Sequence, residues 1–253
     1  MIEGVSPDLP HTDRLPASKE WVLRATRPLV RLGLRLGWRV KVHGVQQVPR
    51  SGPVILAANH IGLLDGPALV ALTRRLTFAM VKHEAFTGPV GQFLIHIGQI
   101  SLNRREIDPR AIRRAVQVLR AGKVVAVFPE GVRGGGEVAR ARGGAAYLAM
   151  VSGAPIVPVA ILGTREPGQR KSQIPHLRRP IHLVYGEPFT VPRSPWPRRK
   201  GAVAKWTEVV REQLANHVVA AQALTGLPLP GPPKIKSVLS TVYSKSSQQA
   251  QES

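Results

Sequence analysis

His60 and Asp65, five positions apart in the stretch ANHIGLLDGPAL (57–68), are the residues of this chain best suited to acid–base chemistry. The apolar run PVILAA (53–58) before them predicts a buried strand. Ligands of open α/β sheets bind beyond the carboxyl ends of the strands, so His60 lies where a reactive group is expected. A carboxylate that accepts a hydrogen bond from one imidazole nitrogen fixes the tautomer and leaves the other nitrogen free as a base. We therefore expect His60 to act as a base oriented by Asp65, although a lone His–Asp pair is also often only a structural hydrogen bond.

The residues that are missing narrow the chemistry open to such a base. The sequence contains no cysteine and no G-x-S-x-G stretch, which argues against a cysteine nucleophile and against a hydrolase-type serine nucleophile. His83 and His96 do not stand at a metal-ligand spacing from His60, so no metal site is predicted. What remains is a base that activates the hydroxyl group of a substrate. This suffices when the bond under attack has a good leaving group, such as the thiol of a thioester.

Cationic residues follow two other predicted strands. The run VVAVF is followed by PEGVRGGG (129–136), a glycine-rich turn that contains Glu130, Gly131 and Arg133. Such a turn at the carboxyl end of a strand can hold a phosphate or a carboxylate, and the alternative is a tight surface turn. The stretch GQISLNR places Arg104 after another short strand. Three strand ends thus offer one base and at least two cations, which suits hydroxyl activation beside an anionic group.

Short runs rich in Val and Ile alternate with helical segments along the chain. Strands are predicted at 40–45, 53–58, 76–81, 98–102, 123–128, 155–162 and 181–186, and helices at 66–74, 89–97, 109–121, 138–152 and 200–220. This alternation predicts an α/β fold: a single-domain sandwich with a central, largely parallel sheet of about seven strands flanked by helices and preceded by an N-terminal amphipathic helix.

The N-terminal region has the composition of a membrane-interface helix. We expect residues 1–18 to form a flexible leader, 19–39 a basic amphipathic helix, 40–220 the folded domain and 221–253 a flexible tail. On the predicted helix, the arginines fall in one stripe opposite Val and Leu residues, which is typical of a helix lying in a membrane interface. The expected membrane contacts are Arg24, Arg27, Arg31, Arg35 and Trp38. The alternative is a helix that packs on the domain with its arginine face in water, and the two can hold together.

The charge of the chain favours an anionic partner. Lys and Arg number 36 against 15 acidic residues, a formal net charge of +21. Nucleic acid, an anionic membrane surface and a phosphorylated substrate all fit such a field. No run reaches the roughly 18 to 20 apolar residues of a membrane span, and the polar, acidic N-terminus is unlike a signal peptide. We therefore expect a peripheral protein at the cytoplasmic face of the membrane.

Four blocks in order resemble the glycerolipid acyltransferases with the HX4D motif, the 1-acyl-sn-glycerol-3-phosphate acyltransferase type. NHIGLLD resembles the HX4D signature, GQISLNR the second block, VFPEGVR the third and IVPVAI the fourth. Asn103 stands where that family has an acidic residue, and Val132 stands for a threonine. The resemblance covers about residues 38 to 190 and marks 40–220 as an acyltransferase domain.

The resemblance implies a reaction and roles for its residues. A lysophospholipid hydroxyl, activated by His60 with Asp65 as orienting group, attacks an acyl thioester; the expected acceptor is 1-acylglycerol 3-phosphate and the product phosphatidic acid. Arg104, Glu130, Gly131 and Arg133 then hold the phosphate-bearing acceptor. The donor is acyl-CoA or an acyl carrier protein thioester, no other cofactor is expected, and Asn103 and Val132 leave a different lysophospholipid or related lipid acceptor as the alternative.

Two other classes of function compete with this interpretation. A basic nucleic-acid-binding protein fits the charge, but aromatic residues, which stack on bases, make up only 5% and no familiar nucleic-acid-binding motif appears, so no nucleic-acid partner is expected. A lipid-binding membrane-surface protein with an inactive site also fits, and the intact His60 and Asp65 argue against it.

Overall fold

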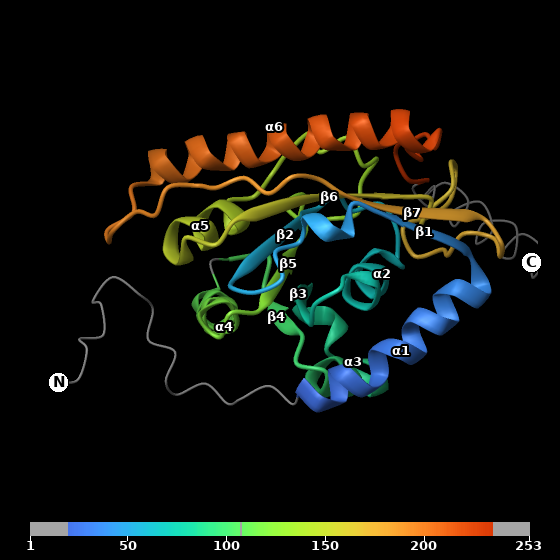
Figure 1. Cartoon of the computed structure of the whole chain (residues 1–253), viewed down its shortest axis with the longest axis horizontal. Coiled ribbons are helices and arrows are strands. Elements are labelled where there is room, and N and C mark those ends of the chain that lie inside the picture. Colours follow the sequence, from blue (N-terminus) through green and yellow to red (C-terminus); the bar gives the residue numbers. More distant parts are fainter. Residues whose placement is uncertain (1–19, 107, 235–253) are drawn as a thin grey trace, which may run out of the picture.

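Seven strands form one sheet in the computed structural model, which describes residues 20–106 and 108–234 (Figure 1). In chain order the strands are β1 (Arg39–His43), β2 (Val54–Ala58), β3 (Thr77–Lys82), β4 (Ile100–Leu102), β5 (Val124–Val127), β6 (Ile156–Leu162) and β7 (Pro180–Tyr185). Their order across the sheet is β1-β7-β6-β2-β5-β3-β4. Only the β6–β7 pair is antiparallel among these strands. The predicted α/β fold with a largely parallel sheet is confirmed.

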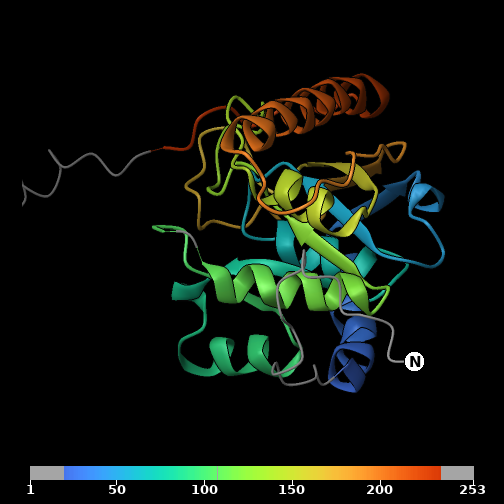
Figure 2. The same ribbon diagram turned by 90° about the vertical axis from the view of Figure 1, so that its left-hand side faces the viewer.

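Helices cover both faces of this sheet. They are α1 (Glu20–Gly37), α2 (Asp65–Leu72), α3 (Gly88–His96), α4 (Pro109–Arg120), α5 (Gly144–Ser152) and α6 (Lys200–Thr225). Two short 3-10 helices, η1 (Val45–Gln47) and η2 (His83–Ala85), lie in the connections. In Figures 1 and 2, α6 lies above the sheet and α1 below it.

The alternation of side chains along β2 explains why both faces need a cover. All five of its residues are buried. Ile55 and Ala57 pack with apolar residues of α4 and α5, whereas Val54, Leu56 and Ala58 pack with those of α2 and with Leu34 of α1. A strand that is buried on both sides must be apolar throughout, as VILAA is.

Two predicted boundaries are wrong. Helix α5 begins at Gly144 and not at 138, because the chain before it wraps around the end of β5: the backbone N–H of Arg142 donates to Pro129 O at 2.8 Å. Helix α6 continues to Thr225, beyond the predicted domain end at residue 220. After it, Leu227 and Leu229 pack against a buried cluster, so the chain from 221 to 234 is part of the folded domain. The predicted leader 1–18 and the rest of the predicted tail lie outside the described residues.

Helix α1 turns part of its arginine stripe toward the domain. Arg31 donates through Nη2 to Ala71 O at 2.8 Å, and Arg27 donates to Thr73 O. These carbonyls end α2, where the helix dipole favours a cation. Trp38 donates from Nε1 to Pro175 O at 3.2 Å. Arg27, Arg31 and Trp38, which were predicted as membrane contacts, thus hydrogen-bond to the domain, as the alternative of a packed helix expects; their contact with a membrane stays a prediction.

The outward face of α1 is largely apolar. Trp21, Leu29, Leu32 and Leu36 are all more than half exposed, and Leu36 reaches 76%. Arg24 and Arg35, which were also predicted membrane contacts, are exposed beside this stripe. No helix within the described ranges is long and apolar enough to span a membrane.

Candidate active site

The site lies at the carboxyl ends of the parallel strands. The turn after β2 carries His60, the turn after β5 carries Glu130, and the loop after β4 carries Arg104. Because β2, β5, β3 and β4 are neighbouring parallel strands, these turns meet at one edge of the sheet. The order of the strands thus brings together groups that are far apart in the sequence.

His60 and Asp65 are hydrogen-bonded. His60 Nδ1 lies 2.8 Å from Asp65 Oδ2, and Asp65 is fully buried as the first residue of α2. The same oxygen accepts the backbone N–H groups of Ile61 at 2.7 Å and Gly62 at 2.8 Å. A carboxylate oxygen that accepts from backbone donors can only accept from the imidazole as well, so Nδ1 carries the proton. Nε2 is left without a proton in the neutral ring and can act as a base.

The second oxygen of Asp65 is held by the loop after β6. Thr164 Oγ1 donates to Asp65 Oδ1, and both residues are fully buried. Gly62 lies so close to this loop that a Cβ there would be 2.3 Å from Thr164 O, which excludes any larger residue. Asn59 binds β6 as well: its side chain donates to Ile161 O at 3.1 Å and accepts from Ile161 N at 2.7 Å. Asn59 and Asp65 therefore fix both ends of the His60 turn to β6 and its loop.

The turn after β5 holds His60 from the other side. Phe128 stacks on the imidazole with ring centroids 4.2 Å apart. The backbone N–H of His60 donates to Glu130 Oε1 at 2.8 Å, and His60 O accepts from Gly134 N at 2.8 Å. Residues 128–134 thus contact the ring, the backbone N–H and the carbonyl of His60, so the orientation of the imidazole depends on that loop.

Glu130 is perturbed by this position. Burial raises the pKa of its carboxyl to about 7, and the nearby Asp65 and Glu137 add to the rise, while the hydrogen bond from His60 opposes it. The family resemblance predicts that Glu130 holds substrate. In the structure, its carboxyl instead accepts the backbone N–H of His60.

Two arginines line the site beside His60. Arg104 donates from Nη1 to Gly131 O at 2.5 Å and lies 3.9 Å from the Glu84 carboxylate. Arg133 donates to Lys171 O at 2.9 Å. Burial lowers the pKa of Arg133, the nearby Asp65 partly opposes this shift, and Arg104 adds a smaller lowering. The guanidinium groups of Arg104 and Arg133 repel each other, and each is bound mainly to a carbonyl. An anionic ligand between them would offset that repulsion.

Gly131 is required at its position in this loop. Its φ is 69°, in the left-handed region that glycine adopts most readily. A Cβ there would also lie 2.7 Å from Nε of Arg142. This glycine lets the chain turn back so that its carbonyl meets Arg104.

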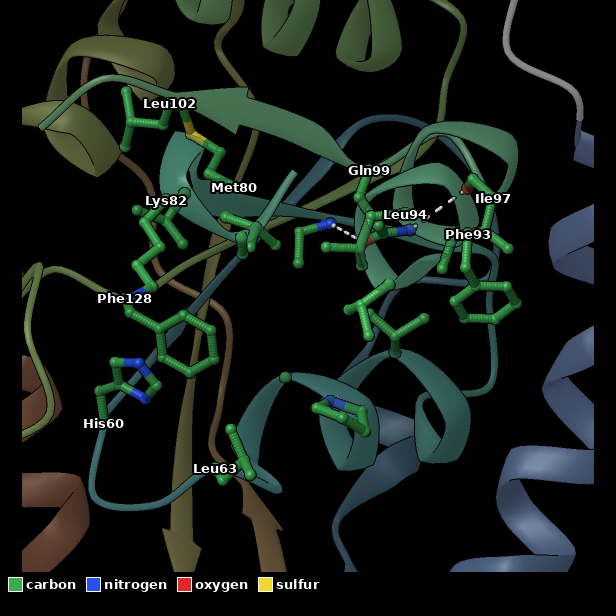
Figure 3. A pocket seen from close by; sticks show the side chains of 18 of the residues that line it. His60, Leu63, Met80, Lys82, Phe93, Leu94, Ile97, Gln99, Leu102 and Phe128 are labelled. Atoms are coloured by element: carbon green, nitrogen blue, oxygen red, sulfur yellow. Dashed lines mark hydrogen bonds between the residues drawn. The ribbon is translucent and has the colours of Figure 1, made fainter. Parts of the chain in front are cut away.

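An apolar pocket of about 690 Å³ opens beside the histidine (Figure 3). It runs between α1, α2, α3 and the strands β3 and β4, and His60, Arg104 and Arg133 belong to its lining. Figure 3 shows Met80, Leu94 and Ile97 on its walls. The amide of Gln99 is consumed internally, since it accepts from Ala79 N at 2.8 Å and donates to Ile97 O at 3.3 Å. The pocket thus joins an apolar chamber to a histidine and two cations.

Several residues of the site escape sequence reasoning. Asn59, Phe128, Thr164 and Arg165 hold the turn that carries His60. Asn59 and Phe128 lie inside the NHIGLLD and VFPEGVR blocks, but the blocks themselves assign them no role. Thr164 follows the IVPVAI block closely, which is the one signal that could have pointed to it.

Comparisons with known proteins agree with this geometry. Residues 39–162 match the family model described as Acyltransferase. The 1-acyl-sn-glycerol-3-phosphate acyltransferase of Borreliella burgdorferi is 33% identical over 144 residues, which cover 54% of this chain and 57% of that protein. The protein of the same name from Bacillus subtilis is 29% identical over 185 residues, 72% of this chain and 89% of that protein.

A solved structure has the same fold. The crystal structure of the 1-acyl-sn-glycerophosphate acyltransferase PlsC from Thermotoga maritima superposes with a TM-score of 0.61 at 23% identity and covers 81% of each chain. Ordered motifs, sheet topology and these matches lead to one conclusion. The chain belongs to the acyltransferase family whose model matches residues 39–162, and the relatives it matches are 1-acyl-sn-glycerol-3-phosphate acyltransferases.

Proposed function

We propose that this protein transfers an acyl chain from a thioester to the free hydroxyl of 1-acylglycerol 3-phosphate and so makes phosphatidic acid. The observation that carries the proposal is one cavity lined by an oriented histidine, two arginines and a large apolar chamber. Those parts correspond to the hydroxyl, the phosphate and the acyl chain that the reaction must bring together.

His60 is the general base in this proposal. Its Nε2 takes the proton of the acceptor hydroxyl as the oxygen attacks the thioester carbonyl carbon. The carbon–sulfur bond of the tetrahedral intermediate then breaks, and the departing thiolate takes the proton back from Nε2. Asp65 stabilises the imidazolium formed between the two steps. Base catalysis of this kind contributes about 10² to 10⁴ in rate, and positioning of the two substrates must supply much of the remainder.

Arg104 and Arg133 bind the acceptor phosphate. A phosphomonoester carries close to two negative charges and can accept paired N–H groups from a guanidinium. Gly131 orients Arg104 through its carbonyl, and Glu130 acts on the site through His60. Of the two departures, Val132 lies exposed in the lining of the pocket, whereas Asn103 donates to Glu106 at 2.6 Å within its own loop.

The acyl chain occupies the apolar pocket. The volume of this chamber is in the range of small-molecule sites. The side-chain amide of Gln99 in its lining already has hydrogen-bond partners within the protein. The thioester donor, acyl-CoA or an acyl carrier protein, supplies the activated carbonyl, and no other cofactor or metal enters the proposed steps. Both donors are anionic and suit a chain of charge +21.

The reaction takes place at an anionic membrane surface, at its cytoplasmic face. The exposed stripe of α1 would enter the interface, with Arg24 and Arg35 beside it at the level of the head groups. Leu32→Asp with Leu36→Asp should reduce binding to vesicles containing phosphatidylglycerol. Leu224→Asp, an equally exposed leucine on α6, is the matched control and should bind as the wild type does. Equal binding by all three proteins would reject this surface.

An acyl-transfer assay tests the proposed function. Purified full-length protein is given lysophosphatidate, lysophosphatidylcholine or lysophosphatidylglycerol with either acyl-CoA or acyl carrier protein thioester. We expect lysophosphatidate to be the best acceptor and His60→Ala to lose about 10² to 10⁴ in kcat without loss of fold. A preference for a large zwitterionic acceptor would overturn the phosphate assignment, and near-normal turnover by His60→Ala would overturn the base.

A further inference from the structure

Arg165 is a buried cation that takes no part in the proposed reaction steps above. It lies in the loop after β6, is 2% exposed, and stands beyond the end of the family match at residue 162. Its guanidinium donates to four backbone carbonyls: Ile61 O at 2.8 Å, Gly134 O at 2.8 Å, Gly231 O at 2.5 Å and Gln169 O at 3.2 Å. A buried charge costs free energy and is often no better for stability than an apolar side chain, so its use calls for a geometric reason.

Two of these carbonyls lie directly beside the groups that carry the reaction. Ile61 follows His60, and Gly134 follows Arg133. The backbone N–H of Gly134 in turn donates to His60 O at 2.8 Å. Arg165 therefore fastens the turn of the base to the loop of the phosphate-binding arginine.

The third carbonyl belongs to the chain after α6. Residues 226–231, which we name the C-terminal strap, bring Gly231 to Arg165 and Leu229 to Gly136. A Cβ on Gly136 would lie 2.8 Å from Leu229 Cδ2 and 2.5 Å from Ile61 Cγ2. Strap, glycine-rich loop and catalytic turn are thus packed against one another.

A strained residue shows that this packing holds the glycine-rich loop in place. Val138 has a φ of 56°, a conformation that a β-branched residue rarely adopts. It is fully buried in the cluster that also contains residues of α6 and, at its margin, Leu227 and Leu229. Such strain persists where the surrounding structure over-determines the backbone, and it gathers near functional sites.

We propose that Arg165 is a positioning residue of the acyl-transfer reaction, which holds the His60 turn against the Arg133 loop and ties both to the C-terminal strap. This inference rests on the proposed function. Loss of the guanidinium lets the two loops move relative to each other. Both kcat, through His60, and KM for lysophosphatidate, through Arg133, then change, whereas a purely structural arginine would change only the melting temperature.

Arg75 provides a matched control for this role. Its guanidinium also donates to three backbone carbonyls, those of Pro49, Gly52 and Gly122. These turns precede β2 and β5, at the opposite edge of the sheet from His60. Arg75→Met therefore removes the same kind of hydrogen bond at a distance from the reaction.

The experiment compares full-length Arg165→Met and Arg75→Met at a temperature at which circular dichroism shows both to be folded. We expect about 10²-fold loss of kcat/KM in Arg165→Met, shared between kcat and KM for lysophosphatidate, and less than about twofold change in Arg75→Met. Arg165→Lys should recover part of it, because a lysine restores the charge but not the fork. Wild-type kcat and KM in folded Arg165→Met would overturn the proposal.

Hydrogen–deuterium exchange supplies a readout independent of turnover. Backbone amides of 60–64, 131–137 and 226–231 should exchange faster in Arg165→Met and remain as in the wild type in Arg75→Met. Should Arg165→Met fail to fold, Leu229→Ser loosens the strap without touching the guanidinium and should give the same kinetic and exchange changes; unchanged values there overturn the proposal. A wild type without acyl transfer would instead refute the proposed function, and the exchange measurement would still test the coupling of the loops.

Discussion

Replacing Asp65 with asparagine isolates the contribution of one negative charge to the site. Asp65 Oδ2 accepts three donors, from His60 Nδ1, Ile61 N and Gly62 N, whereas within residues 20–106 and 108–234 Oδ1 accepts only the Thr164 hydroxyl. An amide has one oxygen and one NH₂ group. Its oxygen should take the place of Oδ2, because the NH₂ group would there face three donors, and Thr164 Oγ1 can rotate to accept from the NH₂ group. We therefore expect Asp65→Asn to keep both the fold and the tautomer of His60.

The loss in rate then reports the charge alone. At an effective dielectric constant of about 20, unit charges about 4 Å apart attract by about 4 kcal/mol, an upper limit for the lost stabilisation of the imidazolium. The difference between a charge-assisted and a neutral hydrogen bond, about 1 to 1.5 kcal/mol, sets the lower limit. These limits correspond to a loss of about ten- to a thousandfold in kcat.

Asp65→Ala is the contrasting variant. It leaves the buried N–H groups of Ile61 and Gly62 without their acceptor, at about 1 to 3 kcal/mol each. At about 2 to 4 °C per kcal/mol for a chain of this size, its melting temperature should fall by about 4 to 24 °C, and that of Asp65→Asn by much less. The assay is acyl transfer with lysophosphatidate together with thermal unfolding of both variants. An asparagine variant as unstable as the alanine variant would refute the predicted orientation of the amide, and wild-type turnover would refute a role for the charge.

Two further variants test the electrostatics of the site. Burial raises the pKa of Glu130 to about 7, so between pH 4.5 and 7 the folded protein binds a proton that the unfolded chain has released. The stability that the folded state gains from protonated Glu130 is present below pH 4.5 and is lost as the pH rises to about 7. The unfolding free energy of the wild type relative to Glu130→Gln should therefore fall by up to about 3 kcal/mol across this window. Urea titration of both proteins measures it. Parallel pH profiles of the two proteins would contradict the shift. Arg133→Ala should raise KM for lysophosphatidate by about 1.5 to 3 kcal/mol, or about ten- to 150-fold, with little change in the donor's KM. A joint rise of both KM values with a lower melting temperature would mean that Arg133 only shapes its loop.

In the proposed reaction, the glycine-rich loop after β5 would connect phosphate binding to catalysis. Arg133 lies on the same loop that binds the N–H, the carbonyl and the ring of His60 through Glu130, Gly134 and Phe128. A phosphate bound at Arg133 would therefore press on the segment that orients the base. Thus mutations that loosen this loop should affect KM and kcat together.

The sequence alone predicted the main helices and strands and the His60–Asp65 pair. Short apolar runs rich in Val and Ile predict strands, and all seven predicted strands are present with their ends within two residues of the prediction. The four-residue spacer between His60 and Asp65 is local, so the turn itself can close their hydrogen bond.

Only the tertiary structure decided which distant residues complete the site. Thr164 and Arg165 reach the catalytic turn because β6 lies beside β2 in the sheet, and periodicity along a chain carries no information about that order. The orientation of α1 was undetermined for the same reason. From the sequence, its arginines could face either lipid or protein. In the structure, Arg27 and Arg31 donate to the carbonyls at the end of α2, and the leucines on the opposite side of the helix are exposed. A helix shows which of its faces are apolar, but what each face meets depends on contacts made by other parts of the chain.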